Sequence, residues 1–304
     1  MQRRTFLQTS AAAAAACGIT SVLTALEPGS RARVVDAHLH CFAGGVDARF
    51  PYHARAPYRP DKPATPEQLL ARMLGAGVDY AIVVHPEPYQ DDHRYLEHCL
   101  AVGKSKLKGT CLFFADQPGA TAAMAALVKK LPGRIVAARI HAYSPERLPP
   151  FGKPELRALW KQAADLGLMV QLHLEPRYAA GFEPLIQEFK GTKVIIDHLG
   201  RPMQGTPEEH SVVVRWSRFA NTVMKIAALP DVGQYPHRDV QPIIRQLTDA
   251  FGADRLIYGG GFGDDATPDS YRAYRERVRG LLTHMSAGDQ AKVLGGTAQK
   301  LFAF

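Results

Sequence analysis

The chain has 304 residues, longer than a typical single domain but within the range of a barrel of alternating strands and helices that folds as one unit. Its composition, 46% hydrophobic and 22% charged, is typical of a soluble globular protein, and no apolar run is long enough to span a bilayer. The formal net charge of +8 is scattered rather than gathered in a Lys/Arg stripe, which argues against a nucleic-acid partner and supports no more than a mild preference for anionic small-molecule substrates.

Residues 1–25, MQRRTFLQTSAAAAAACGITSVLTA, begin with a pair of arginines, Arg3 and Arg4, before a weakly apolar, alanine-rich stretch. A positive region followed by an apolar region at the extreme N-terminus resembles a twin-arginine export signal. The resemblance implies a periplasmic protein and cleavage near Ala25. The three cysteines beyond this segment are odd in number and lack paired spacing, so no disulfide framework is predicted.

From residue 33 onward, short β-branched runs alternate with amphipathic segments. Eight runs are predicted as buried strands: 33–40, 80–86, 107–115, 134–142, 168–176, 193–200, 223–230 and 255–262. The clearest helices between them are 65–77, 154–167, 239–252 and 269–285, with Thr65 as N-cap before Pro66. Parallel strands that each need a crossover helix close naturally into a (β/α)8 TIM barrel, predicted here as a single domain over 33–304. A doubly wound open sheet is the alternative, but it calls for a glycine-rich turn after the first strand, where this chain has histidines.

Barrel active sites lie where the strands end, and these positions are rich in titratable residues. Six of the twelve histidines fall there. In chain order the strand ends carry His38 and His40, His85 and Glu87, Asp116, Arg139 and His141, His173 and Glu175, and Asp197 and His198.

His38 and His40 are two residues apart on one strand, so both point to the same face. With His173 and His198 aimed at the same barrel mouth, this pattern favours a metal site. The alternative is a pair of core histidines whose ring nitrogens bond to the backbone.

Four motifs resemble the amidohydrolase-related (amidohydrolase 2) family, nearest its branch of pyrone-dicarboxylate and sugar-lactone hydrolases: VVDAHLH, QLHLEP, IIDHLGRP and DRLIYGGGFG. The resemblance runs from residue 33 to the end of the chain. It implies His38, His40 and His173 as ligands of a divalent metal, Zn or Mn, and places His198 beside the reacting water or carbonyl. Several lactonases of the family work without metal, so a metal-free mechanism stays open.

The family normally ends strand 8 with Gly-Ser-Asp-Trp-Pro, whose Asp orients the nucleophilic water and accepts its proton. Here Gly261 stands at that Asp position. One interpretation is that the glycine run folds back and returns the carboxylate of Asp264 or Asp265 to the site. The other is that both are solvated and the base is lost. Asp197 is adjacent to His198 on a strand and is therefore expected to turn into the barrel wall.

Four further residues are predicted to bind substrate: Glu87, Arg139, His141 and Arg201, the arginines being suited to a substrate carboxylate. Arg177 is expected in a surface salt bridge, and the aromatic-rich loop 42–66 as a lid or wall. The predicted function is hydrolysis of a small carboxylated lactone or ester, a C–O bond rather than a C–N bond. The alternatives are a decarboxylase of the same family and a non-catalytic periplasmic binding barrel.

Overall fold

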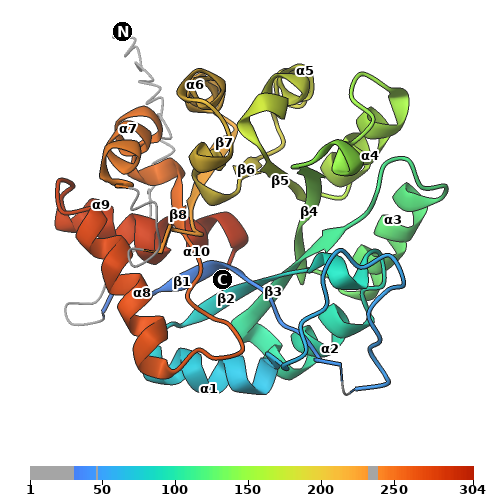
Figure 1. The fold of residues 1–304 in the computed structure, drawn as a ribbon, viewed down its shortest axis with the longest axis horizontal. Coiled ribbons are helices and arrows are strands. Elements are labelled where there is room, and N and C mark those ends of the chain that lie inside the picture. Colours follow the sequence, from blue (N-terminus) through green and yellow to red (C-terminus); the bar gives the residue numbers. More distant parts are fainter. Residues whose placement is uncertain (1–30, 46, 232–238) are drawn as a thin grey trace, which may run out of the picture. The chain divides into compact units, whose positions relative to one another are not determined.

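The computed structural model describes residues 31–45, 47–231 and 239–304. Within the compact unit Ala32–Phe304, eight parallel strands follow one another around the sheet in chain order (Figure 1). Their bounds are β1 Val35–Leu39, β2 Tyr80–Val84, β3 Leu107–Leu112, β4 Ile135–Ala142, β5 Met169–Leu174, β6 Val194–Ile196, β7 Thr222–Ile226 and β8 Leu256–Tyr258. All eight predicted strands are confirmed, and the architecture is that of a (β/α)8 barrel.

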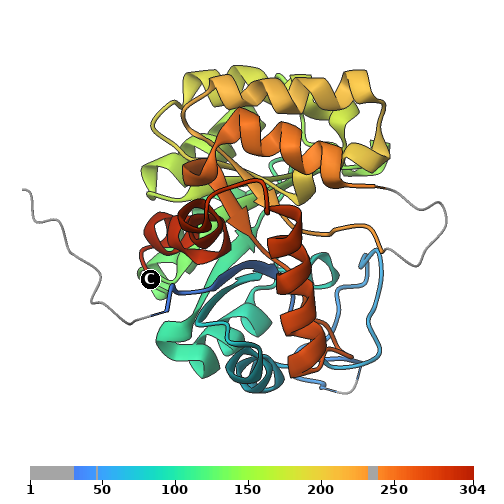
Figure 2. The ribbon, with the colours of Figure 1, turned by 90° about the vertical axis from the view of Figure 1, so that its left-hand side faces the viewer.

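Helices link and cover these strands. They are α1 Pro66–Ala76, α2 Arg94–Gly103, α3 Ala120–Lys130, α4 Pro154–Asp165, α5 Glu183–Glu188, α6 Pro207–Arg215, α7 Gln241–Phe251, α8 Pro268–Leu281, α9 Ala287–Ala291 and α10 Thr297–Phe302. The four predicted helices correspond to α1, α4, α7 and α8. Thr65 caps α1 through a capping box with Gln68, as the Thr-Pro start predicts. Helix α8 packs against α1, as Figures 1 and 2 show.

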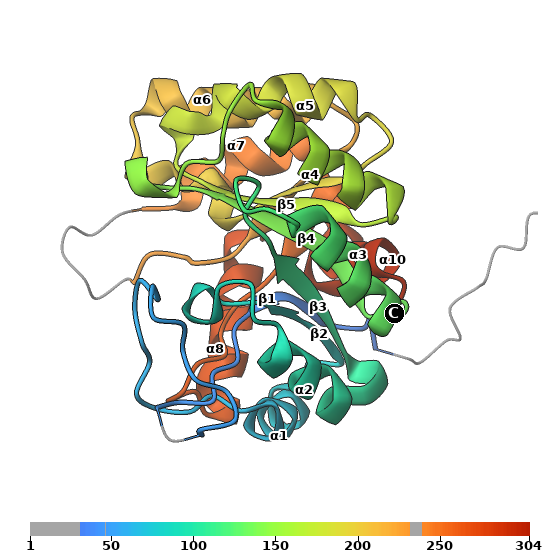
Figure 3. The same cartoon turned by 90° about the vertical axis from the view of Figure 1, so that its right-hand side faces the viewer.

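The barrel interior is apolar at its lower end. Alternate residues of six strands pack together there, with Ala298 and Phe302 of α10 added to the same cluster: Val35, Ala37, Ile82, Val84, Val136, Ile195, Val223 and Ile257. A larger apolar layer lies between the strands and the surrounding helices. Figure 3 shows α10 and the blue loop that follows β1 on opposite sides of the strands. The polar residues at the strand ends therefore lie at the opposite end of the barrel interior from α10, with the apolar cluster between them.

No ladder joins β1 to β8 in the described residues, and side-chain bonds hold the two strands together instead. Asp36 on β1 accepts a hydrogen bond at 2.8 Å from the backbone N–H of Gly260, just beyond β8. Its other oxygen accepts from the Tyr271 hydroxyl of α8 at 2.6 Å. Asp36 thus fixes the glycine-rich segment against β1.

The export signal predicted for residues 1–25 lies outside the described residues. In the part of the chain that the structure describes, no helix combines the length and apolarity needed to cross a membrane.

Gly295 offers a test of the packing between the chain's C-terminal segment and β1. A Cβ at Gly295 would lie 1.8 Å from the carbonyl oxygen of Arg33, so the backbone must move to admit one. We expect Gly295→Ala to lower the free energy of unfolding by about 1–3 kcal/mol, measured by urea denaturation. Gly296→Ala is the control, because its nearest new contact is an ordinary 3.7 Å. Equal stability of the two variants would contradict this packing.

Candidate active site

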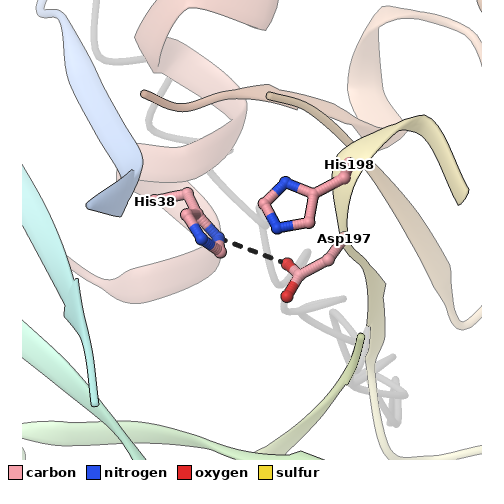
Figure 4. Close-up of side chains that lie close together, drawn as sticks. All are labelled: His38, Asp197 and His198. Atoms are coloured by element: carbon pink, nitrogen blue, oxygen red, sulfur yellow. Dashed lines mark ion pairs between the residues drawn. The ribbon is translucent and has the colours of Figure 1, made fainter. Parts of the chain in front are cut away.

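The centre of the candidate site is a buried carboxylate, Asp197, at the end of β6. Its Oδ1 lies 2.8 Å from Lys225 Nζ of β7, and its Oδ2 accepts from Arg139 Nε of β4 and Gln171 Nε2 of β5 at 3.0 and 2.9 Å. His38 Nδ1 of β1 lies 3.5 Å from Asp197 Oδ1 (Figure 4). Side chains from four strands therefore converge on one carboxylate at the end of a fifth.

Burial alone would raise the pKa of Asp197, but the Lys225 and Arg139 cations outweigh it and hold the pKa well below its usual range. Burial lowers the pKa of Lys225, and Asp197 opposes that shift. At neutral pH the pair is a carboxylate and an ammonium.

The prediction that Asp197 turns into the barrel wall is wrong. Ile195 belongs to the interior apolar cluster, and strand alternation therefore points Asp197 inward as well. His198 would face outward on a regular strand, but its backbone takes a left-handed conformation, φ 56°, just beyond the end of β6. This turn brings the His198 ring to the same side as Asp197, as Figure 4 shows.

Five imidazoles form an arc beside Asp197: His40, His38, His198, His173 and His141. Successive ring centroids lie 5.1, 4.4, 5.2 and 5.1 Å apart. Burial lowers the pKa of all five, to about 4 for His40 and about 3 for His198. The rings are therefore neutral at pH 7, and each can donate a proton at one nitrogen and accept at the other.

Glu87 orients one end of this arc. Its Oε1 lies 2.8 Å from His141 Nδ1, and its Oε2 accepts from the Tyr143 hydroxyl at 2.6 Å. Both ring nitrogens of His141 are buried, and neither makes a well-aligned hydrogen bond among the described residues. The Glu87 carboxylate lies against Nδ1, which favours the proton on Nδ1 and leaves the lone pair at Nε2. A carboxylate-oriented imidazole with a free Nε2 is the arrangement of a general base.

The sequence-based candidates for the strand-8 acid lie elsewhere. Asp264 and Asp265 are both exposed, and the structure does not bring either into the arc. The Asp position itself cannot be refilled easily, because Gly261 has φ 107° and a Cβ there would lie 2.8 Å from Tyr271 Cδ2. The role of Asp264 or Asp265 as proton acceptor stays a prediction, and His141 with Glu87 is the base that the geometry offers.

The structure does not gather the three predicted metal ligands into one donor group. Among the described residues, one group has the donor spacing for a metal ion: His38, Asp197 and His198. Of the predicted set, His38 alone is in that group; His40 Nδ1 bonds to the Val84 carbonyl at 2.7 Å, and the His173 ring lies next to His141 and His198. The set of His38, His40 and His173 stays a prediction as a metal site.

Whether a divalent metal fits depends on Lys225. The donor types, two imidazoles and a carboxylate, suit such an ion. However, the Lys225 ammonium already lies 2.8 Å from Asp197 Oδ1 and 3.2 Å from His38 Nδ1, so it contacts two of the three residues of that group. An ion bound to the same atoms would sit against a buried positive charge, so the residues as arranged do not fit a divalent metal.

Of the predicted substrate-binding residues, some are bonded to other side chains of the site and one keeps an unpartnered donor. Arg139 is buried and bonded to Asp197, and Glu87 is bonded to His141 and Tyr143, so both are committed within the site. Arg201 lies over the Tyr143 ring at 5.6 Å, and its buried Nη1 has no partner among the described residues. The role of Arg201 in binding a substrate carboxylate stays a prediction.

A cavity of about 290 Å³ opens beside His141, with apolar walls from the ends of β3 and β4 and from the turn 148–150. Arg55 and Asp116 lie among its polar lining. The loop 42–66 also borders the site, since the Phe42 ring lies 6.1 Å from His40. Arg177 pairs with Glu175 and is half-exposed, as predicted.

The prediction from sequence missed Lys225, Gln171 and Tyr143. Lys225 carried a usable signal: it is a lone charge inside the apolar run VMKIAAL, at the same strand parity as the interior Val223. A charge at an inward position of a barrel strand requires a partner, and Asp197 on the neighbouring strand is that partner.

The buried imidazoles predict a loss of stability in acid. His40, His93 and His198 have pKa values lowered to about 4, 4 and 3, below the ordinary 6.5. As pH falls from about 6.5 towards 4, the unfolded chain takes up protons that the folded protein excludes, at up to about 1.4 kcal/mol per pH unit for each histidine. Asp36, whose pKa burial raises to about 7, acts in the opposite sense but is one group against three. Urea midpoints at pH 7, 6 and 5 should fall in that order. Equal midpoints at the three pH values would contradict the burial of these histidines in their neutral form.

Residues 35–304 match the family model of the amidohydrolases. L-fucono-1,5-lactonase of Burkholderia ambifaria is 27% identical over 292 residues, covering 87% of this chain and 93% of that protein. A probable 2-pyrone-4,6-dicarboxylic acid hydrolase from Acinetobacter baumannii, solved with citric acid bound, gives a TM-score of 0.71 at 19% identity, over 90% of this chain and 100% of that one. A zinc-bound amidohydrolase from Burkholderia multivorans gives 0.67 at 16% identity, over 90% and 100%.

Proposed function

The chain belongs to the amidohydrolase family of hydrolases, and we propose that it hydrolyses a small lactone or ester, most directly the ring C–O bond of a carboxylated or sugar-derived lactone. The similarity to an L-fucono-1,5-lactonase supports this substrate class. The observation that carries the proposal is the oriented imidazole of His141, which supplies a base where the family's strand-8 Asp is absent.

In the proposed mechanism, the Nε2 lone pair of His141 takes a proton from water as the water oxygen attacks the lactone carbonyl carbon. Glu87 accepts from Nδ1–H and stabilises the imidazolium that forms. The ring C–O bond then breaks, and the same proton returns from Nε2 to the leaving oxygen. The product is an open hydroxy acid, and His141 ends neutral.

The negative charge that develops on the carbonyl oxygen needs donors. Arg139 and Lys225 supply the fixed positive field below the arc, and the neutral rings of His38, His173 and His198 offer N–H groups beside it. Fixed donors in a buried site stabilise such charge without reorganising water. Arg201 would hold a carboxylate on the substrate, stacked over Tyr143. We place the reaction in the periplasm because residues 1–25 resemble an export signal.

Acid release from a panel of substrates tests the proposal. The full-length chain would be offered L-fucono-1,5-lactone, 2-pyrone-4,6-dicarboxylate and a simple ester, with a pH indicator as readout and the spontaneous rate subtracted. We expect turnover of at least one lactone. Release of CO2 from an aromatic carboxylate without lactone opening would make the protein a decarboxylase. Thermal stabilisation by these compounds without turnover would make it a binding barrel.

A further inference from the structure

Lys225 is the charged residue of the site that has no place in the mechanism above beyond its field. It comes from the middle of β7, its side chain is 0% exposed, and its Nζ lies 2.8 Å from Asp197 Oδ1 and 3.2 Å from His38 Nδ1. A lysine without access to water is rare unless it is paired. Here it bridges a carboxylate and an imidazole from two other strands.

The bridge fixes the tautomer of His38. An ammonium group only donates hydrogen bonds, so the His38 Nδ1 that faces Lys225 accepts with its lone pair. Lys225 Nζ is also closer to that nitrogen, at 3.2 Å, than Asp197 Oδ1 is, at 3.5 Å. The proton of the neutral ring is then on Nε2. His38 presents an N–H donor, not a lone pair, at its second nitrogen.

The charged groups at Asp197 already carry a net positive charge. Lys225 and Arg139 contribute two positive charges against one carboxylate, and the five imidazoles of the arc are neutral. Two of the three residues in the candidate metal group, Asp197 and His38, are in contact with the ammonium. A divalent ion would have to displace Lys225 or share the buried space with it.

We propose that Lys225 is the resident cation of this site: its ammonium fixes Asp197, sets His38 as an Nε2–H donor and excludes a divalent metal from the group His38, Asp197 and His198. Lys225 is a positioning residue in this role, since it acts through His38 and Asp197. The inference concerns what the site binds, and it stands or fails separately from the identity of the lactone.

Metal affinity of the full-length chain tests this directly. Zn²⁺ and Mn²⁺ would be titrated by calorimetry into the wild type, Lys225→Met, Lys225→Arg and the surface control Lys193→Met, whose side chain is exposed just before β6 and bonds to the Ala220 carbonyl. We expect Lys225→Met to bind one equivalent at least about 100-fold more tightly than the wild type, because a buried unit charge beside a divalent ion is removed. Lys225→Arg and Lys193→Met should resemble the wild type. Equal affinity of wild type and Lys225→Met would overturn the proposal.

A second measurement reads the wild-type protein and does not depend on a Lys225 variant. Nitrogen-15 NMR of the wild-type histidines distinguishes the two neutral tautomers, and His38→Gln assigns the signal of His38. The proposal requires the Nε2–H form for His38. The Nδ1–H form, with its proton on the nitrogen that faces Lys225, would overturn it whatever the metal titration gives.

Discussion

Asp197→Ala is expected to lower the free energy of unfolding by about 3–5 kcal/mol, because it leaves the buried Lys225 and Arg139 without their shared carboxylate. Both cations are almost without access to water, so solvent cannot replace the lost partner. Urea denaturation at pH 7 measures the effect. Asp197→Ala is also expected to lose its activity, because Lys225 and Arg139 no longer have the carboxylate that holds them in place beneath the arc.

The control for this loss is Asp254→Ala. Asp254 is exposed and pairs with Lys292 at the surface, where an ion pair contributes about 0–1 kcal/mol. A drop for Asp197→Ala no larger than that of Asp254→Ala would show that the buried network is not formed as described.

His141→Gln is expected to lower kcat for lactone opening by about 10²- to 10⁴-fold, the range for loss of a general base. Glutamine keeps a polar side chain but has no lone pair of comparable basicity, and KM should change less than kcat. Glu87→Gln should lower kcat as well, by less, because His141 keeps its lone pair but loses the carboxylate that orients it. Steady-state kinetics on the same lactone measures both.

Two further variants make this result specific. His284→Gln is the matched control, since His284 is exposed and bonds only to Thr248 in the described structure. The double variant Asp264→Asn, Asp265→Asn should keep wild-type kcat, because both carboxylates are exposed. If instead the double variant loses activity and His141→Gln does not, the acid shifted along strand 8 is the base and the assignment of His141 is wrong.

The barrel could be predicted from sequence because its signals are local. Each strand is a short β-branched run, and Thr65 with Pro66 marks a helix start that the structure reproduces. The strand-end histidines follow from the same periodicity, and all five histidines of the arc are among the residues that the sequence places at strand ends. Local periodicity does not predict which buried charges pair with each other. Lys225 and Asp197 are 28 positions apart in sequence (225 − 197) and meet only across neighbouring strands.

The prediction failed where the backbone leaves regular geometry. Strand alternation assigned Asp197 to the wall because His198 was taken as the inward residue; the left-handed φ at His198 instead brings both side chains to the same side. The glycine run after β8 left two interpretations open from sequence, a returned carboxylate or two solvated acids, because its course depends on the bond from Gly260 to Asp36 and on the packing of Tyr271 against Gly261. Such positions are set by tertiary contacts, which a sequence period does not encode.

The most direct measurement is lactone opening by the wild-type chain after exhaustive dialysis against a chelator, with residual metal determined by elemental mass spectrometry. With Lys225 as resident cation and His141 as base, we predict that the metal-depleted protein keeps its full kcat and that added Zn²⁺ or Mn²⁺ does not raise it. Activity that disappears on depletion and returns with one equivalent of metal would contradict this mechanism.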